Sequence, residues 1–299
     1  MPDYPVLQVL PEHVVGDEAL GSKTKFWFQK DDQRWLFKET REGTGEDWAE
    51  KIAAEVARIS GISAATVELA EFQGRRGCAC LSFVDTSTGE GLLHGNEILA
   101  GMVLGYDRAK KFHQSDHTLQ NIEKAIRKFL PDKASHGRAL TKLASYIVLD
   151  ALIGNTDRHH ENWALLLRLI KKDAGAQILT EVAPSFDHAS SLGRELLDDG
   201  RTRLLDSGSV GTYVRRGHGA IYEKTTDRHG VNPLSLAEFG ARHFPEFFMP
   251  TLQQLKAVPV QRLQDTVIDV PSVRMSDASK TFVRVFFAYT YDVLTRLVP

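Results

Sequence analysis

Three side chains in the second half of the chain have the types and spacing of a phosphotransfer site. Asp157 and Asn162 lie five positions apart in the segment GNTDRHHEN, and Asp187 follows in a short turn, SFDHASS. Phosphotransfer needs a carboxylate that accepts the proton of the attacking hydroxyl. It also needs oxygen ligands that hold Mg²⁺ against the nucleotide phosphates. We therefore predict Asp157 as the catalytic carboxylate, and Asn162 and Asp187 as Mg²⁺ ligands.

The spacing alone is weak evidence, because Asp, Asn and Gly are also ordinary turn residues. The flanking sequence supports the functional interpretation. A long apolar helical run precedes Gly154, and the apolar run WALLLRLI follows Asn162 as a predicted strand. The same DRHxxN pattern recurs at Asp227–Asn232, but that copy has no long apolar helix before it and runs into Pro233. We interpret the first copy as functional and the second as a coincidence.

A nucleotide site also needs a cation near the phosphates, and Lys38 is the candidate. It ends the segment WLFK, in which apolar residues alternate as in a strand. A carboxylate on the next predicted helix would hold this lysine in place. Glu50 lies nearer the start of that helix and is our choice, with Glu55 as the alternative.

Two further segments are predicted to contact ATP. The loop at residues 20–25, LGSKTK, precedes the first hairpin strand, and Gly21, Ser22 and Lys23 are predicted to cover the phosphates through backbone amides and the lysine charge. The connector at residues 81–85, LSFVD, lies where the composition changes, and the backbone of Ser82 and Phe83 is predicted to pair with adenine. A plain strand end is the alternative for this connector.

The elements that must position these residues fall into two parts, residues 1–84 and residues 85–299. The first is predicted to be strand-rich, with a hairpin at 26–38, one helix over 46–60, and strands at 67–72 and 78–84 joined by a turn at 74–77. The second is predicted to be helical, with a helix over about 137–152 and further helices over 234–299. Residues 192–232 are polar and Gly-rich, and we expect them to be mobile. Strands first and helices second predict a bilobal α+β protein with a cleft between an N-lobe and a C-lobe.

The composition excludes some classes of protein. Hydrophobic residues make up 42% of the chain, charged residues 25%, and the net charge is −2, which gives no argument for nucleic-acid or anionic-membrane binding. Cys78 and Cys80 are predicted to be reduced thiols. The N-terminus has no signal-peptide pattern, and no apolar stretch is long enough to span a bilayer. We therefore expect a cytoplasmic protein with no membrane span and no direct nucleic-acid binding.

The sequence resembles the HipA-like kinases. The segments GSKTKFW, WLFK, IGNTDRHHENWALL and FDHASSLG carry the resemblance, which extends over residues 20–290. It implies a protein-kinase-like fold, ATP and Mg²⁺ as cofactors, and protein serine/threonine kinase activity. It assigns the same roles to Asp157, Asn162, Asp187 and Lys38. Full-length HipA-like toxins carry an additional N-terminal subdomain, so the chain resembles the shorter, core-only members.

Other functions remain open at this point. The DRHxxN segment is also similar to the catalytic loop of phosphatidylinositol 3- and 4-kinases, so a lipid or small-molecule kinase is one alternative and a nucleotide-binding pseudokinase is another. The family further implies a toxin-like role, an antitoxin or regulatory partner, and self-inhibition by autophosphorylation. Ser22 and Thr24 are the candidate autophosphorylation sites, unless their hydroxyls only cap the turn. His159 and His160 are interpreted as structural or solvent-facing.

Overall fold

The computed structural model describes residues 4–17, 24–172 and 175–299. The predicted phosphate-covering residues Gly21, Ser22 and Lys23 lie outside the described residues, so their role stays a prediction.

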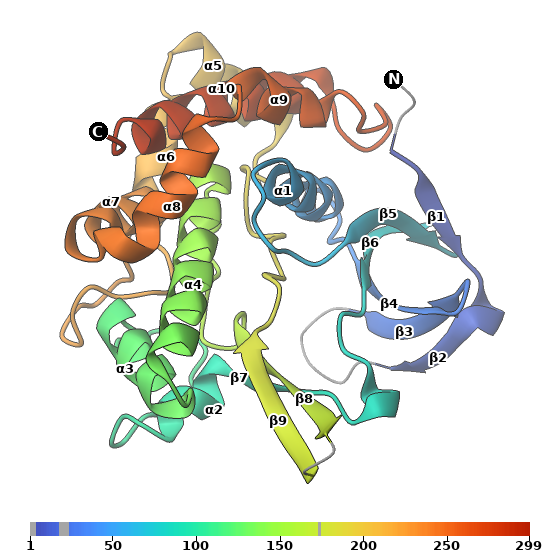
Figure 1. The fold of residues 1–299 in the computed structure, drawn as a ribbon. Coiled ribbons are helices and arrows are strands. Elements are labelled where there is room, and N and C mark those ends of the chain that lie inside the picture. Colours follow the sequence, from blue (N-terminus) through green and yellow to red (C-terminus); the bar gives the residue numbers. More distant parts are fainter. Residues whose placement is uncertain (1–3, 18–23, 173–174) are drawn as a thin grey trace.

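A six-stranded sheet forms most of the first part of the chain (Figure 1). Its strand order is β1-β5-β6-β4-β3-β2, in which only the β1–β5 pair is parallel. The predicted hairpin is β3–β4. The predicted turn at 74–77 is wrong in position, because residues 75–77 pair with β4 and β5 and belong to β6. The strands are β1 Val6–Val9, β2 Val14–Asp17, β3 Lys25–Lys30, β4 Gln33–Glu39, β5 Val67–Phe72 and β6 Arg75–Leu81.

The apolar side of this sheet decides where Lys38 points. Phe26, Phe28 and Phe37 are buried together, and the Phe26 and Phe37 rings stack with centroids 4.9 Å apart. Side chains alternate between the two faces of a strand. Burial of Phe37 on one face therefore directs Lys38 to the other, where helix α1 (Glu46–Ile59) packs against β5 and β6 (Figure 1).

Helix α4 runs through the centre of the helical part and packs against α7, α8 and α10 (Figure 1). It is longer than predicted and begins at Lys133. Residues 192–232, expected to be mobile, contain helices α5 and α6. The helices of this part are α2 Gly95–Ala100, α3 Leu119–Phe129, α4 Lys133–Ile153, α5 Asp198–Asp206, α6 Val210–Arg216, α7 Pro233–His243, α8 Pro245–Lys256, α9 Val260–Gln264 and α10 Asp277–Thr295.

Two features of this part place the catalytic segment. Helix α4 ends at Gly154, whose φ is +65° and where a Cβ would lie 2.5 Å from the Phe286 ring, so glycine is required there. A three-stranded antiparallel sheet flanks the loop: β7 (Gly91–His94) comes before it in the chain, and β8 (Ala164–Lys172) and β9 (Gly175–Val182) follow it. Asn162 precedes β8 and Asp187 follows β9, so the sheet brings the two predicted metal ligands back to one place.

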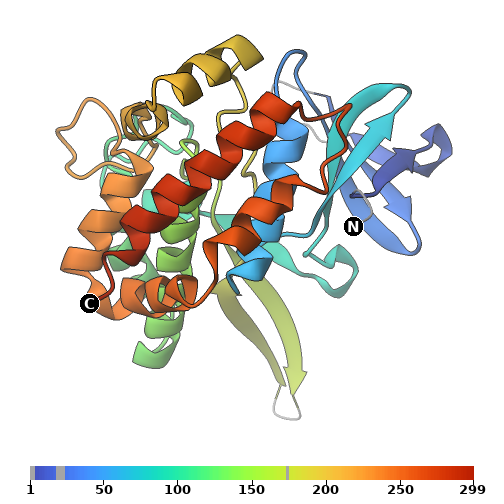
Figure 2. The ribbon, with the colours of Figure 1, turned by 90° about the horizontal axis from the view of Figure 1, so that it is seen from above.

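The C-terminal helices also reach the first part of the chain. Seen from above, α10 crosses the helical part, and α9 lies between α10 and α1 (Figure 2). The α+β class predicted from the sequence is confirmed. No helix in the described stretches of the chain is both long and apolar enough to cross a lipid bilayer.

Candidate active site

Lys38 and Asp187 form an ion pair at the centre of the site. The Lys38 Nζ atom donates a hydrogen bond to Asp187 Oδ1 at 2.9 Å, and it lies 3.8 Å from Glu50 Oε2. Burial lowers the pKa of Lys38, but the negative charges around it, that of Asp187 foremost, outweigh burial and leave the pKa well above its usual value. The Lys38 charge in turn holds the pKa of Asp187 below its usual value. Both groups are therefore charged at neutral pH.

Helix α1 brings Glu50, and not Glu55, to this ion pair. Glu50 is only 1% exposed, and its Oε1 accepts a hydrogen bond from the His188 amide at 2.9 Å. Its Oε2 faces Lys38 and has no hydrogen-bond partner among the residues described. Glu55 instead accepts a hydrogen bond from Lys51 at 2.8 Å, away from the site. Glu50 thus links α1, Lys38 and the segment that follows Asp187.

The loop at residues 155–162, which we call the catalytic loop because it carries the predicted catalytic residue Asp157, is held to α4 by a buried ion pair. Arg158 donates to both carboxylate oxygens of Asp150 on α4, at 2.8 Å each, and to the Asn162 carbonyl at 2.7 Å. The Asn162 side-chain amide donates to the Asp157 carbonyl at 2.7 Å. These bonds join the two ends of the loop to each other and to the helix, so Asp157 and Asn162 keep a fixed separation.

Phosphotransfer also needs a carboxylate that can accept a proton near neutral pH, and Asp157 has this property. Burial, with a contribution from the Asp187 charge, raises the pKa of Asp157 to about 6 despite the opposing charge of Arg194. The Asp157 carboxylate accepts no hydrogen bond from any residue that the structure describes. A carboxylate with this pKa at a cavity surface suits a general base.

Asn162 and Asp187 fit a Mg²⁺ site. The Asn162 side-chain nitrogen donates its hydrogen bond to the Asp157 carbonyl. The side-chain oxygen of Asn162 therefore points away from that bond and stays available as a ligand. Asp187 adopts a left-handed backbone conformation, φ +61°, which is uncommon outside glycine. The described residues contain no group of three His, Cys, Asp or Glu side chains that could hold a metal. Two protein ligands match Mg²⁺, which usually keeps water and phosphate oxygens as its other ligands.

Two cavities meet at the ion pair. One, of about 850 Å³, is lined by the connector after β6 and by Asn162, and we call it the hinge cavity. The other, of about 750 Å³, is lined by Asp157 and residues 218–220, and we call it the loop cavity. Lys25, Lys38, Lys111, His159 and Asp187 line both cavities. A group bound in one cavity therefore lies next to a group bound in the other.

In the connector at residues 81–85, the backbone amide and carbonyl of Phe83 are both available to bind a base. Strand β6 ends at Leu81, earlier than predicted, and the Ser82 amide donates to the Arg34 carbonyl at 2.8 Å. The Val84 amide is bonded to the Ser82 hydroxyl at 3.3 Å. Neither the amide nor the carbonyl of Phe83 is hydrogen bonded within the described part of the chain, and the Phe83 ring packs against Phe186. Phe83 is thus better placed than the Ser82 amide to contact an adenine edge.

Two side chains at the site were not predicted from the sequence. Lys111 lies in a loop, lines both cavities and pairs with Glu161 at 2.6 Å. His159 also lines both cavities. Its Nδ1 accepts a hydrogen bond from the Glu161 amide at 3.2 Å, which assigns the proton of the neutral ring to Nε2. The positions of Lys111 and His159 at the two cavities follow from tertiary packing and could not be predicted from the sequence.

The solvent-facing interpretation of the two loop histidines is wrong. His159 is 8% exposed and His160 is 1% exposed. The His160 Nδ1 lies 2.7 Å from the Tyr106 hydroxyl, which ties the loop to the segment before α3. The structural interpretation therefore holds for His160.

The second DRHxxN copy is not a second catalytic loop, although it lies near the first. Asp227 accepts a hydrogen bond from the Lys224 amide at 2.9 Å, and Asn232 caps the first turn of α7. His229 and Gly230 nevertheless line the loop cavity. The DRHxxN spacing at residues 227–232 therefore has no catalytic meaning, but this segment forms part of the wall of the loop cavity.

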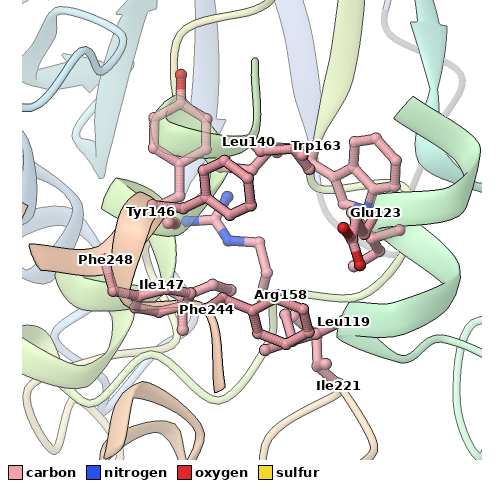
Figure 3. Close-up of a pocket in the computed structure, with 14 residues that line it drawn as sticks. Leu119, Glu123, Leu140, Tyr146, Ile147, Arg158, Trp163, Ile221, Phe244 and Phe248 are labelled. Carbon is pink, nitrogen blue, oxygen red and sulfur yellow. The ribbon is translucent and has the colours of Figure 1, made fainter. Parts of the chain in front are cut away.

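An apolar pocket of about 50 Å³ lies behind the catalytic loop (Figure 3). Its walls include Tyr146 of α4 and Phe248 of α8, with Arg158 and Trp163 from the loop side. The Trp163 indole donates to His117 Nε2 at 3.1 Å. The side chains on this side of the loop thus pack inward, which leaves Asp157 to face the loop cavity.

Comparison with known proteins identifies the family and the fold of the chain. The model of the HipA-like C-terminal domain family matches residues 18–232. No curated protein sequence matches the chain. The structure of the Helicobacter pylori proinflammatory kinase CtkA superposes with a TM-score of 0.76 at 18% identity, covering 98% of both chains.

A chain of the Shewanella oneidensis MR-1 complex of HipA, HipB and operator DNA gives a TM-score of 0.58 at 12% identity, covering 94% of this chain and 65% of that one. At these identities the likeness shows the fold alone, and the protein-kinase-like fold predicted from the sequence is confirmed. The matched family and the fold together support a kinase-like phosphotransferase.

Proposed function

The chain belongs to the HipA-like C-terminal domain family, and on this basis we propose that it transfers the γ-phosphoryl group of ATP to a serine or threonine hydroxyl of a protein. One observation carries the proposal. The Lys38–Asp187 pair lies where the two cavities meet, and Asp157 lines the loop cavity beside it, so a cation and two carboxylates face one space, as phosphotransfer requires.

Nucleotide binding is assigned to the hinge cavity. Phe83 offers its backbone amide and carbonyl to the adenine edge, and Lys38, held by Glu50, offers its ammonium to the phosphates. Asn162 and Asp187 would hold Mg²⁺, which neutralises phosphate charge when it is bound. Lys38 bonds only the Oδ1 atom of Asp187, so the second carboxylate oxygen, Oδ2, stays available to the metal.

The acceptor hydroxyl is assigned to the loop cavity. Asp157 orients this hydroxyl and accepts its proton as the oxygen attacks the γ-phosphorus. The raised pKa of Asp157, about 6, keeps the carboxylate ionised at neutral pH while bringing it closer to the pKa range of an effective base. The fixed catalytic loop holds Asp157 at a set distance from the metal ligand Asn162.

A purified-protein assay tests the proposal. Wild-type protein is incubated with labelled ATP, Mg²⁺, lysate proteins and lipid vesicles, and phosphosites are mapped by mass spectrometry. Asp157→Ala should bind ATP like the wild type but lose several orders of magnitude in rate. Equal rates for the two proteins would contradict the assignment of Asp157. Label found in lipid alone would favour the phosphatidylinositol-kinase-like alternative.

Regulation by autophosphorylation belongs to the same proposal. Thr24 lies next to Lys25, which lines both cavities, and Ser22 is two residues further back. A phosphate on Thr24 would add a charge of about −1.5 to −2 next to Lys25 in the chain, whereas Ser22 lies outside the described residues. We expect the Ser22→Asp, Thr24→Asp protein to bind ATP more weakly than wild type. Unchanged affinity, or no phosphate on either residue after long incubation with ATP and Mg²⁺, would reject this step.

A toxin-like role with a protein partner is proposed by analogy. The Shewanella oneidensis HipA structure is a toxin–antitoxin complex with HipB and operator DNA. We propose that this chain acts in the cytoplasm and is regulated by a partner protein. Co-purification of the tagged chain from its own cells, followed by mass spectrometry, tests for that partner.

A further inference from the structure

We infer that a side cavity next to Asp157 holds a large apolar side chain of the protein acceptor, a few residues away from the phosphorylated hydroxyl. The inference rests on the proposed function and adds a determinant of specificity to it. The side cavity has a volume of about 520 Å³ and lies between the end of α4, the end of α6 and the start of α7.

The side cavity is continuous with the loop cavity. Thr156, Ser190, Arg194 and His218 line both. Thr156 directly precedes Asp157 in the chain, so their Cα atoms are about 3.8 Å apart. An extended polypeptide advances by about 3.3 Å per residue. An acceptor strand whose hydroxyl lies at Asp157 therefore reaches the side cavity within a few residues.

The chemistry of the side cavity favours an apolar occupant. Val214, Leu234 and Phe286 form part of its walls and are buried in the helical core. The Asn232 amide beside them already has partners, because it donates to the carbonyls of Val214 and Gly217, at 2.8 Å each. A polar occupant of this apolar part would find that amide nitrogen already bonded, whereas an apolar side chain loses water-exposed surface.

The rim of the cavity indicates that this occupant belongs to a polypeptide. The rim carries the exposed side chains of Glu195, Arg216 and His218, of both charge signs. An enzyme that takes its acceptor from a membrane is helped by a basic or apolar surface around the entrance. A mixed polar rim around an apolar floor instead resembles the anatomy of a protein–protein contact.

Gly217 allows the cavity to be filled with one substitution. Its φ is −62°, so a side chain causes no backbone strain, and an added Cβ would lie 3.1 Å from Thr156 Cγ2 and 3.9 Å from Asn232 Nδ2. Both neighbours line the side cavity. Gly217→Leu should therefore place its side chain inside the cavity. Gly137→Leu is the matched control, because a Cβ there meets nothing within 4 Å and the residue lines none of the three cavities.

The experiment uses the full chain with ATP and Mg²⁺ on a peptide library that has a fixed central serine and one further fixed residue in each pool. Wild-type protein should prefer a large aliphatic or aromatic residue over alanine at one position, by about tenfold or more. Gly217→Leu should lose that preference and about tenfold in kcat/KM on the preferred peptide, and much less on its alanine version. Gly137→Leu should behave as wild type, and ATP affinity should be equal in all three proteins.

The outcomes separate the inference from the proposed function. Peptide phosphorylation without an apolar preference overturns the inference and leaves the kinase assignment standing. So does a Gly217→Leu protein that keeps the wild-type preference and rate. Phosphorylation of lipid only, or of no acceptor, overturns the proposed function and the inference with it. If Gly217→Leu does not fold, the wild-type library result and Gly217→Ala decide the question.

Discussion

Replacement of Asp157 by asparagine should stabilise the protein while removing its phosphotransfer activity. The pKa of Asp157 is raised from 3.8 to about 6, burial being the main cause. The folded chain therefore binds the proton of this carboxyl more tightly than the unfolded chain does. Ionisation of Asp157 must then oppose folding, and asparagine keeps the shape of the side chain without the charge.

The pKa values set the size and the pH range of the effect. A raised carboxyl pKa means that the folded state holds more protons between pH 3.8 and 6, so stability falls as pH rises through that window. A difference of about two units corresponds to about 3 kcal/mol once Asp157 is fully ionised. We expect Asp157→Asn to raise the free energy of unfolding by about 3 kcal/mol at pH 7.5 and by about 1.5 kcal/mol at pH 5.

Urea unfolding followed by tryptophan fluorescence, at several pH values between 5 and 8, measures this difference. Asp206→Asn is the control, because Asp206 is exposed at the end of α5 and no hydrogen bond or ion pair of its side chain is found in the described part of the chain. Its substitution should change stability little at any pH. The unfolding slope should be the same in all variants, so that shifts in midpoint report stability.

Two results would refute the reasoning. An Asp157→Asn protein less stable than wild type at pH 7.5 would show that the carboxylate makes favourable contacts in the folded state. A gain that is the same at pH 5 and pH 7.5 would show that its cause is not ionisation. A stabilised but inactive variant would instead show that the site tolerates an unfavourable charge because catalysis needs it.

Further predictions concern the groups that hold the site together. Lys38→Met leaves Glu50 and Asp187 without their cation, so calorimetry should show weakened ATP binding and urea unfolding a loss of about 3 kcal/mol or more. Asp187→Asn replaces a proposed Mg²⁺ ligand, so ATP binding should lose its Mg²⁺ dependence in calorimetry. Arg274→Met removes one of the two ion pairs of the buried Asp47 of α1, the one at 2.9 Å, and leaves the pair with Arg76 at 3.0 Å, so the free energy of unfolding should fall by about 2 kcal/mol. Because α1 carries Glu50, the same variant should raise the KM for ATP, and Arg274→Lys should partly restore it.

The sequence by itself predicted the candidate site residues and most of the elements that carry them. The alternation of WLFK indicated a strand, and burial of Phe37 on one face left Lys38 for the other. The apolar run before Gly154 indicated α4, and the left-handed Gly154 ends it. These features follow from local periodicity and turn chemistry, which act within a few residues of the chain. The α+β class was predicted correctly for this reason, and the family was predicted from the resemblance of particular sequence segments.

The choice between Glu50 and Glu55 required the tertiary structure. Five residues along an α-helix turn the side chain by about 140°, so the two carboxylates face different neighbours. Lys51 and Arg58 bind Glu55 on one side of α1, and the His188 amide binds Glu50 on the other. Nothing in the local sequence states which side of the helix meets Lys38.

Lys111 and His159 show the same limit at the catalytic loop. In the sequence Lys111 is one of many basic residues in a polar stretch, and His159 follows Asp157 as an ordinary polar neighbour. Their positions at the junction of the two cavities depend on Tyr106 binding His160 and on Trp163 binding His117, contacts between residues 46 or more positions apart. Local sequence fixes residue types and periodicity, but which side chains meet across such separations is decided by packing of the whole chain, because burial and hydrogen-bond satisfaction are properties of the assembled core.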